Sequence, residues 1–257
     1  MSENAPKKEL FQLNRLRPAI HPPVAFLAQT LLDDLGDNLL SLSVVGSALT
    51  GDFHPKYSDI NTVMTVKQRS HSLLKLLAGY ASKMGRQKIR APLLMTPEYI
   101  EQSCDVFGVE FLDFQFNHIT VYGSDPFGAL TFTKENVRLQ CERQLKAALI
   151  RLRQSYIRSA GKAKLVTDLL MECVKELTVL LRALLWLVDV DRDKEVLPNL
   201  RKAVLQFQFD EKIITHLVKL QLQHARPATD QVEYLFEGLY LTIDHINRKV
   251  DEMEITK

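Results

Sequence analysis

The chain has 257 residues, of which 46% are hydrophobic and 25% are charged, values that are ordinary for a globular protein and exclude wholesale disorder. This length is enough for one large domain or two smaller ones, each with a buried core. The 33 basic and 31 acidic side chains leave a net charge of +2, which argues against a protein that binds nucleic acid through a basic excess.

The cysteines and the apolar runs of the sequence indicate in which cellular compartment the protein works. Cys104, Cys141 and Cys173 are odd in number and far apart, so we expect reduced thiols and no zinc site. The first ten residues, MSENAPKKEL, lack the apolar segment of a signal peptide. The most apolar run, 177–188, is too short to span a bilayer and contains an arginine. The sequence therefore predicts a cytoplasmic protein without a membrane segment.

Up to about residue 132, short apolar runs alternate with turn residues and brief helical patterns, which predicts an α/β domain. A short amphipathic helix is expected over 22–36, and another over 71–85, where Gly85 would end it. A third should begin after Thr96, whose side chain would cap it. Strands are expected at 39–46, 60–66, 91–96, 108–116 and 119–123.

From Thr133 onward the strand patterns are absent and helical periodicity takes over. Thr133 is expected to cap a long helix that Gly161 ends. Further helices are expected at 162–188, 199–207, 210–224 and 230–250, which together predict an up-and-down helical bundle. The basic residues on the long helix that follows Thr133, at 134–160, are expected to form a solvated face, with contact to a polyphosphate or nucleic acid as the alternative.

The predicted fold is therefore α+β, with an N-terminal mixed-sheet domain followed by an all-helical bundle domain. We place an N-terminal extension at 1–19, the α/β domain at 20–132 and the helical domain at 133–257. A homodimer formed through the helical half is a reasonable expectation.

The strand predicted at 39–46 ends in Gly46, and Ser47 follows at once. Glycine lets the backbone turn sharply and lets a phosphate approach closely. Ser47 would offer a hydroxyl and a backbone N–H near a helix N-terminus, which is a natural site for an anion. Such turns are common, so the pair alone does not identify a site.

Two polar side chains open the next predicted strand. Ser58 and Asp59 lead into it, and strand alternation would place Asp59 and Asn61 on the same face. Carboxylates in those two places could jointly hold Mg²⁺, which prefers oxygen ligands. Asp113 is expected in the middle of the strand at 108–116, where an acid in an apolar run is costly unless it is paired or bound to a metal.

Basic residues flank this region. In the loop 51–58, His54 and Lys56 could reach a phosphate, although an exposed loop with ordinary polar residues explains them as well. The turn KMGRQKIR at 83–90 is expected to solvate a connection from helix to strand.

The stretch GSALTGDFHPKYSDIN at 46–61, with the isolated Asp113 downstream, resembles the nucleotidyltransferase superfamily of the DNA polymerase β type. More narrowly, it is similar to bacterial nucleotidyltransferase-domain proteins related to the aminoglycoside-modifying group, which join a small α/β domain to a helical one. The runs VEFLDF, VYGSDPF and VRLQCERQL add to the likeness, which spans roughly residues 20–185.

The resemblance implies roles for individual residues. Gly46 and Ser47, with Ser58, would bind the phosphates of a nucleoside triphosphate. Asp59 would ligate the metal that bridges the triphosphate, and Asp113 would help to hold a second metal or activate the acceptor. The implied reaction is in-line attack of a hydroxyl on the α-phosphate with departure of pyrophosphate, assisted by Mg²⁺ or Mn²⁺.

Asn61 stands where the family has a second aspartate. The metal set of Asp59, Asn61 and Asp113 is therefore short of one negative charge, and we expect weak or absent transfer. Three functions stay open: an active nucleotidyltransferase, an impaired relative that binds nucleotide as a sensor or regulatory partner, and a scaffold for protein–protein contact. The sequence does not name the acceptor, which would be a small molecule or a protein; nucleic acid is disfavoured.

Overall fold

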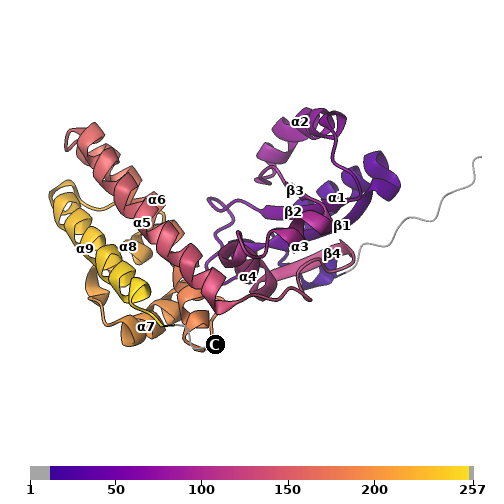
Figure 1. The fold of residues 1–257 in the computed structure, drawn as a ribbon. Helices are drawn as coiled ribbons and strands as arrows, with labels where there is room; N and C mark the ends of the chain where they lie inside the picture. The colour runs from indigo at the N-terminus through magenta and orange to yellow at the C-terminus, as the bar shows by residue number, and fades with distance from the viewer. Residues whose placement is uncertain (1–11, 255–257) are drawn as a thin grey trace, which may run out of the picture. The chain divides into compact units, whose positions relative to one another are not determined.

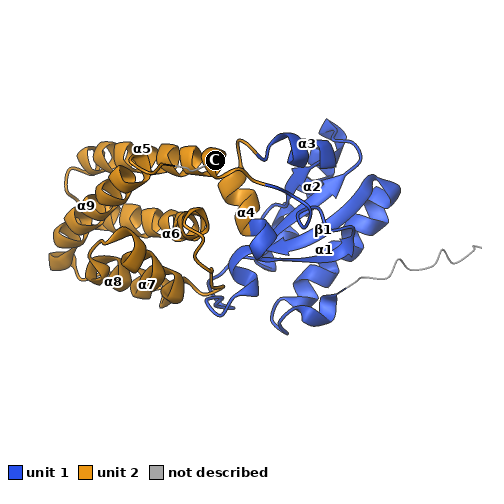
Figure 2. Ribbon diagram, turned by 60° about the horizontal axis from the view of Figure 1, so that its bottom comes forward, with its two compact units in different colours: residues 1–104, 114–131 blue, residues 105–113, 132–257 orange. Residues whose placement is uncertain are grey.

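The computed structural model describes residues 12–254 (Figure 1). Most of the N-terminal extension predicted at 1–19, namely residues 1–11, lies outside the described part, and the rest contains the short 3-10 helix η1, Leu13–Arg15. The chain divides into two compact units, one made of residues up to 104 with 114–131, the other of 105–113 with the residues from 132 onward (Figure 2). We call them the α/β unit and the helical unit.

A four-stranded mixed sheet forms the centre of the α/β unit, as predicted. Its strand order is β3-β2-β1-β4, with β1 antiparallel to both β2 and β4 and with β2 parallel to β3. Four of the five predicted strands are therefore present, and their bounds are Leu39–Val45 for β1, Asn61–Val66 for β2, Leu93–Met95 for β3 and His118–Gly123 for β4.

Helices and sheet share an apolar core in this unit. The helices are α1 at His21–Leu35, α2 at His71–Arg86 and α3 at Pro97–Gln102. Thr96 caps α3 as predicted, since its hydroxyl accepts a hydrogen bond from the Tyr99 N–H at 3.2 Å. The core combines side chains of α1 and α2 with alternate residues of the strands, among them Leu27, Leu31, Leu42, Val44, Met64, Leu73 and Val121.

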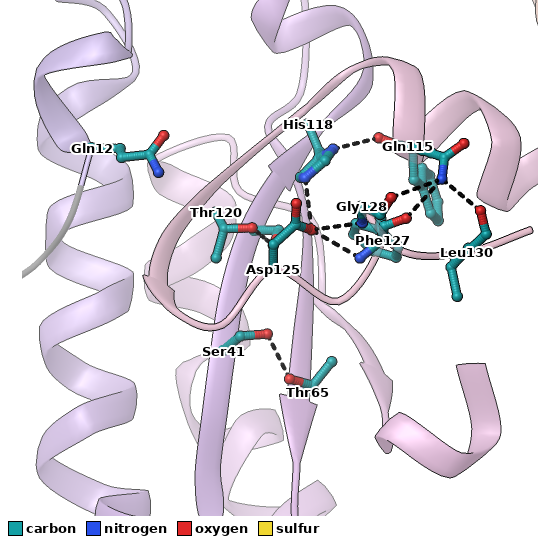
Figure 3. A network of polar contacts seen from close by, with 12 residues as sticks. Gln12, Ser41, Thr65, Gln115, His118, Thr120, Asp125, Phe127, Gly128 and Leu130 are labelled. Carbon is teal, nitrogen blue, oxygen red and sulfur yellow. Dashed lines mark hydrogen bonds and ion pairs between the residues drawn. The ribbon is translucent and has the colours of Figure 1, made fainter. Parts of the chain in front are cut away.

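The other face of the sheet is polar where β1 meets its two neighbours. Ser41 and Thr65 pair through their hydroxyl oxygens at 2.6 Å, and Ser43 and Thr120 pair at 2.9 Å. All four side chains are buried, so these cross-strand hydrogen bonds satisfy groups that would otherwise be costly inside the protein. The Ser41–Thr65 pair is drawn in Figure 3.

The prediction of a strand at 108–116 is wrong, because this segment forms the helix α4, Gly108–Phe116. The Val109 N–H at its start donates to the side-chain oxygen of Gln140 at 2.9 Å. Val109 and Leu112, three residues apart, lie on one face of the helix and join the core of the helical unit. For this reason residues 105–113 belong to the helical unit, although the sequence analysis assigned them to the α/β domain.

Five longer helices build the rest of the helical unit, which is the predicted bundle. They are α5 at Lys134–Ser159, α6 at Ala163–Leu187, α7 at Val196–Phe207, α8 at Glu211–Leu222 and α9 at Val232–Asp251. Thr133 caps α5 by accepting from the Asn136 N–H at 3.3 Å. α6 packs against all four of the others, and its side chains are buried on most sides. Across residues 12–254, every helix is too short or too polar to traverse a bilayer.

Candidate functional site

The turn at Gly46 has a left-handed backbone conformation and is fixed by two hydrogen bonds to Asn117. Gly46 has φ +74°, in the left-handed region that favours glycine. The Asn117 side chain donates from Nδ2 to the Gly46 carbonyl at 3.0 Å, and the Gly46 N–H donates to the Asn117 carbonyl at 3.3 Å. A Cβ on Gly46 would meet only Asn61 Nδ2, at 3.9 Å, so the φ angle rather than crowding requires glycine here.

Ser47 and Ser58, both predicted to bind nucleotide, have different surroundings. Ser47 is exposed in the 3-10 turn η3, Gly46–Leu49, and its carbonyl accepts from the Thr50 N–H at 3.1 Å. The Ser58 hydroxyl instead accepts from the His54 N–H at 2.9 Å, while the Ser58 N–H donates to the His54 carbonyl at 2.8 Å. Ser58 therefore closes the loop 54–58, and Ser47 presents its side chain to solvent.

Asp59 and Asn61 open β2 beside this turn. Asn61 is the first residue of the strand and lies directly opposite Val45, the residue before Gly46. Asp59 is exposed, and its Oδ2 lies 3.5 Å from Nε of Arg90. The structure thus places Gly46, Asn61 and Asp59 at the same end of the sheet, with the Arg90 guanidinium beside the Asp59 carboxylate.

Asp113 has a different environment from the one predicted. It lies in α4, within the helical unit, and not in a strand of the sheet. Its two carboxylate oxygens accept from Arg182, Oδ1 from Nε at 2.5 Å and Oδ2 from Nη2 at 3.2 Å. Both side chains are about nine-tenths buried. The buried guanidinium therefore supplies the compensation that an acid in an apolar segment needs.

A second arginine lies close to this pair. Burial lowers the pKa of Arg192, an effect that the negative charge of Asp113 opposes and the positive charge of Arg182 reinforces. The surroundings of Asp113 are thus those of a buried ion pair with an additional cation nearby.

The residues at the start of β2 do not fit a two-metal site. Nowhere in residues 12–254 do three or more His, Cys, Asp or Glu side chains gather as metal ligands. At the site itself, Asp59 supplies a carboxylate and Asn61 a neutral amide oxygen, and the neighbouring side chain is the cation of Arg90. Mg²⁺ is normally held by carboxylates with substrate phosphates and water, in near-octahedral geometry, and a nearby guanidinium repels it.

His118, the first residue of β4, contacts Asp125 in the loop that follows the strand (Figure 3). His118 begins β4 opposite Val45, so its side chain lies on the same face of the sheet as that of Asn61. Its Nδ1 is 2.8 Å from the Phe114 carbonyl oxygen, and its Nε2 is 2.9 Å from Oδ1 of Asp125. Acceptor oxygens therefore face both ring nitrogens.

Asp125 organises the loop after β4. Its Oδ1 accepts from the N–H groups of Phe127 and Gly128, at 2.8 and 3.2 Å. Partial burial raises the pKa of Asp125, but the Phe127 and Gly128 N–H groups and the His118 side chain outweigh it and hold the pKa below its usual value. Gln115 ties down the same loop, because its Nε2 donates to the carbonyls of Phe127 and Leu130 at 3.0 and 2.8 Å.

Sequence reasoning missed Asn117, His118 and Arg90 as neighbours of the turn. Arg90 reaches Asp59 through a parallel bridge between Ile60 and Ile89, and such pairing leaves no local pattern in the sequence. Asp125 did carry a local signal, since an aspartate followed by proline is typical of a turn.

The chain was compared with known proteins in three ways. No protein-family model matches it, and no curated protein matches it. A solved structure does: spectinomycin adenyltransferase AAD(9) from Enterococcus faecialis, crystallised with ATP and spectinomycin, is similar with a TM-score of 0.51 and 11% sequence identity. The match covers 90% of this chain and 99% of that one. At this identity the likeness concerns the fold, which is that of a nucleotidyltransferase followed by a helical domain.

Proposed function

We propose that this protein binds a nucleoside triphosphate at the Gly46–Ser47 turn and that it transfers a nucleoside monophosphate weakly or not at all. The observation that carries the proposal is the left-handed conformation of Gly46. The Asn117 side chain donates a hydrogen bond to the Gly46 carbonyl, and Asn61, the first residue of β2, lies beside the turn. The similar fold of a structure determined with ATP supports the choice of ligand. A glycine backbone lets a phosphate approach closely, and the exposed Ser47 supplies a hydroxyl donor.

We expect weak nucleotidyl transfer because the site has too few carboxylates to offset the charge of two metal ions. Nucleotidyl transfer assisted by two metals uses a pair of cations about 4 Å apart, and these need several carboxylates to offset their charge. Here the residue at the start of β2 after Asp59 and Ile60 is the neutral Asn61, and Asp113 is engaged by Arg182. An acceptor, where one is used, would be a hydroxyl group of a small molecule or a protein.

Titration with nucleotides and the substitution Asn61→Asp test this function. We expect the unmodified protein to bind ATP or GTP in calorimetry and to release little pyrophosphate with Mg²⁺ or Mn²⁺ present. Asn61→Asp restores the missing negative charge, so it should make ATP binding tighter in the presence of the metal and raise pyrophosphate release. Asn14→Asp adds the same charge at an exposed position in η1 and should change neither quantity.

Two results would count against the proposal. Failure of the folded protein to bind any nucleotide, with or without metal, would remove it. Rapid pyrophosphate release by the unmodified protein would show that Asn61 does not impair transfer.

A second candidate function, protein–protein contact, is favoured by a groove along α5. The groove has a volume of about 560 Å³ and lies within the helical unit. Val106, Leu139 and Ile150 line it, with side chains 45–57% exposed. Exposed apolar residues gathered in this way are typical of a binding surface for a regulatory partner or a second copy. If the groove forms a homodimer, Leu139→Lys should convert the dimer to a monomer in light scattering, whereas a monomeric unmodified protein would exclude that use.

A further inference from the structure

The segment before β3 brings positive charge to the start of β2. The Ile60 N–H donates to the Lys88 carbonyl at 2.7 Å, and the Arg90 N–H donates to the Ile60 carbonyl at 3.0 Å. The side chains of Ile60 and Ile89 are buried in the core of the α/β unit, whereas Asp59 and Arg90 are exposed. This backbone pairing fixes Arg90 as the neighbour of Asp59 in the folded chain.

Two lysines reinforce the positive charge. The Lys88 ammonium donates to the carbonyl of Lys56, and the Lys56 ammonium lies 5.2 Å from the centre of the Tyr57 ring. The contacts at the start of β2 therefore place three cations, those of Arg90, Lys88 and Lys56, near the single carboxylate of Asp59.

A guanidinium can neutralise and hydrogen-bond a phosphate group without a metal. It stays charged at any physiological pH, and its planar array of donors binds phosphate oxygens through two parallel hydrogen bonds. The contact between Asp59 and Arg90 is between side chains that are 49% and 61% exposed, so solvent weakens it and Arg90 can turn to a stronger anion. Asp59 would then orient the guanidinium instead of ligating a metal.

We propose that Arg90, positioned by Asp59 and supported by Lys88 and Lys56, binds the phosphates of the nucleotide in place of a divalent metal, so that ATP binding does not require Mg²⁺. This inference rests on the proposed function, since it specifies how the same site recognises its ligand. The inference also accounts for Asn61, because a second carboxylate at the start of β2 would repel phosphates that no metal shields.

Calorimetric titration of the full-length protein with ATP, in EDTA and in excess Mg²⁺, tests the inference. We expect similar affinities in the two buffers. Arg90→Gln should weaken ATP binding in EDTA by about tenfold to a hundredfold, the range for loss of hydrogen bonds from a charged group. Arg90→Lys should fall between Arg90→Gln and the unmodified protein, because it keeps the charge and loses the paired donors.

The companion variants separate a guanidinium site from a metal site. Asp59→Asn should weaken ATP binding less than Arg90→Gln does, and equally in EDTA and in Mg²⁺, because it removes only the group that orients Arg90. Neutralising a metal ligand would instead weaken binding in Mg²⁺ alone. Arg201→Gln, which removes an exposed charge in α7 of the helical unit, should leave affinity unchanged. Circular dichroism of each variant checks that it is folded.

The outcomes distinguish this inference from the proposed function. Binding that appears only with Mg²⁺ and is lost in Asp59→Asn would overturn the role of Arg90 while leaving a nucleotide-binding protein. An Arg90→Gln variant that binds ATP in EDTA as tightly as the unmodified protein would also overturn it. No binding by the folded protein in either buffer would overturn both.

Discussion

At the scale of single residues, the environment of Asp113 indicates a structural role. Its carboxylate and the Arg182 guanidinium satisfy each other inside the helical unit, and both side chains are about nine-tenths buried. Removing one partner of a buried ion pair leaves the other charged and unpaired, which is costly, whereas replacing both with apolar side chains is often tolerated.

We therefore predict that Asp113→Asn destabilises the helical unit by about 3 kcal/mol or more and leaves ATP affinity unchanged. The double variant Asp113→Leu with Arg182→Met should recover much of the loss. Asp168→Asn is the matched control, because Asp168 pairs with Arg226 on the surface, where such a contact is worth about 0–1 kcal/mol. Urea unfolding followed by circular dichroism measures these differences. Equal, small effects of Asp113→Asn and Asp168→Asn would contradict the structural role.

Asp125 gives a prediction about pH. Its pKa is lowered in the folded protein, so its ionised form contributes stability above the unfolded-state pKa of about 3.9. That contribution is lost as the pH falls through the lower, folded-state pKa. The difference in free energy of unfolding between the unmodified protein and Asp125→Asn should therefore be constant around pH 5 to 6 and shrink below about pH 4. Urea unfolding at a series of pH values checks this, and a difference that persists unchanged at the lowest pH would refute it.

At the scale of elements, the close approach of α8 and α9 depends on a glycine. A Cβ on Gly238 of α9 would lie 2.6 Å from Cγ1 of Ile213 in α8 and 3.0 Å from its Cδ1 and Cγ2 atoms. Ile213 is buried and β-branched, so its side chain has little freedom to move aside. Crowding should outweigh the gain in helix propensity that alanine normally brings over glycine.

Gly238→Ala should therefore destabilise the protein by about 1–3 kcal/mol, the range for an overpacked core. Gly79→Ala should instead stabilise it by about 0.5–1 kcal/mol, because Gly79 lies within α2 and a Cβ there would meet no atom within 4 Å. Thermal unfolding of the two variants measures both effects. Stabilisation by both substitutions would show that α8 and α9 are not packed as described.

The elements also show what the sequence can and cannot predict. Local chemistry was sufficient for the caps Thr96 and Thr133 and for the strands that carry the Gly46 turn and Asn61. It failed for α4, where five of the nine residues of GVEFLDFQF are large and apolar. A short run of this kind fits a buried helix as well as a strand, and only its packing partners decide between them. The ion pair of Asp113 depends on Arg182, 69 residues away, and could not be read locally.

At the scale of the whole molecule, the division into units separates the predicted site residues. Gly46, Ser47, Asp59 and Asn61 all belong to the α/β unit, and Asp113 belongs to the helical unit. The shared fold with AAD(9), at 11% identity, means that the architecture is kept while nearly all side chains differ. The contacts of this chain's own residues therefore define the site, and the charge around Asp59 is its most informative feature.

Hydrogen-exchange mass spectrometry with and without ATP, in EDTA, tests the central claim most directly, because it reports where on the chain the nucleotide binds. We predict that ATP slows amide exchange in residues 46–61, around the Gly46 turn and Asp59, and in residues 86–90. Exchange in 108–116, which includes Asp113, should be unchanged. Absence of protection at 46–61, or protection confined to other segments, would contradict a nucleotide site at the Gly46 turn.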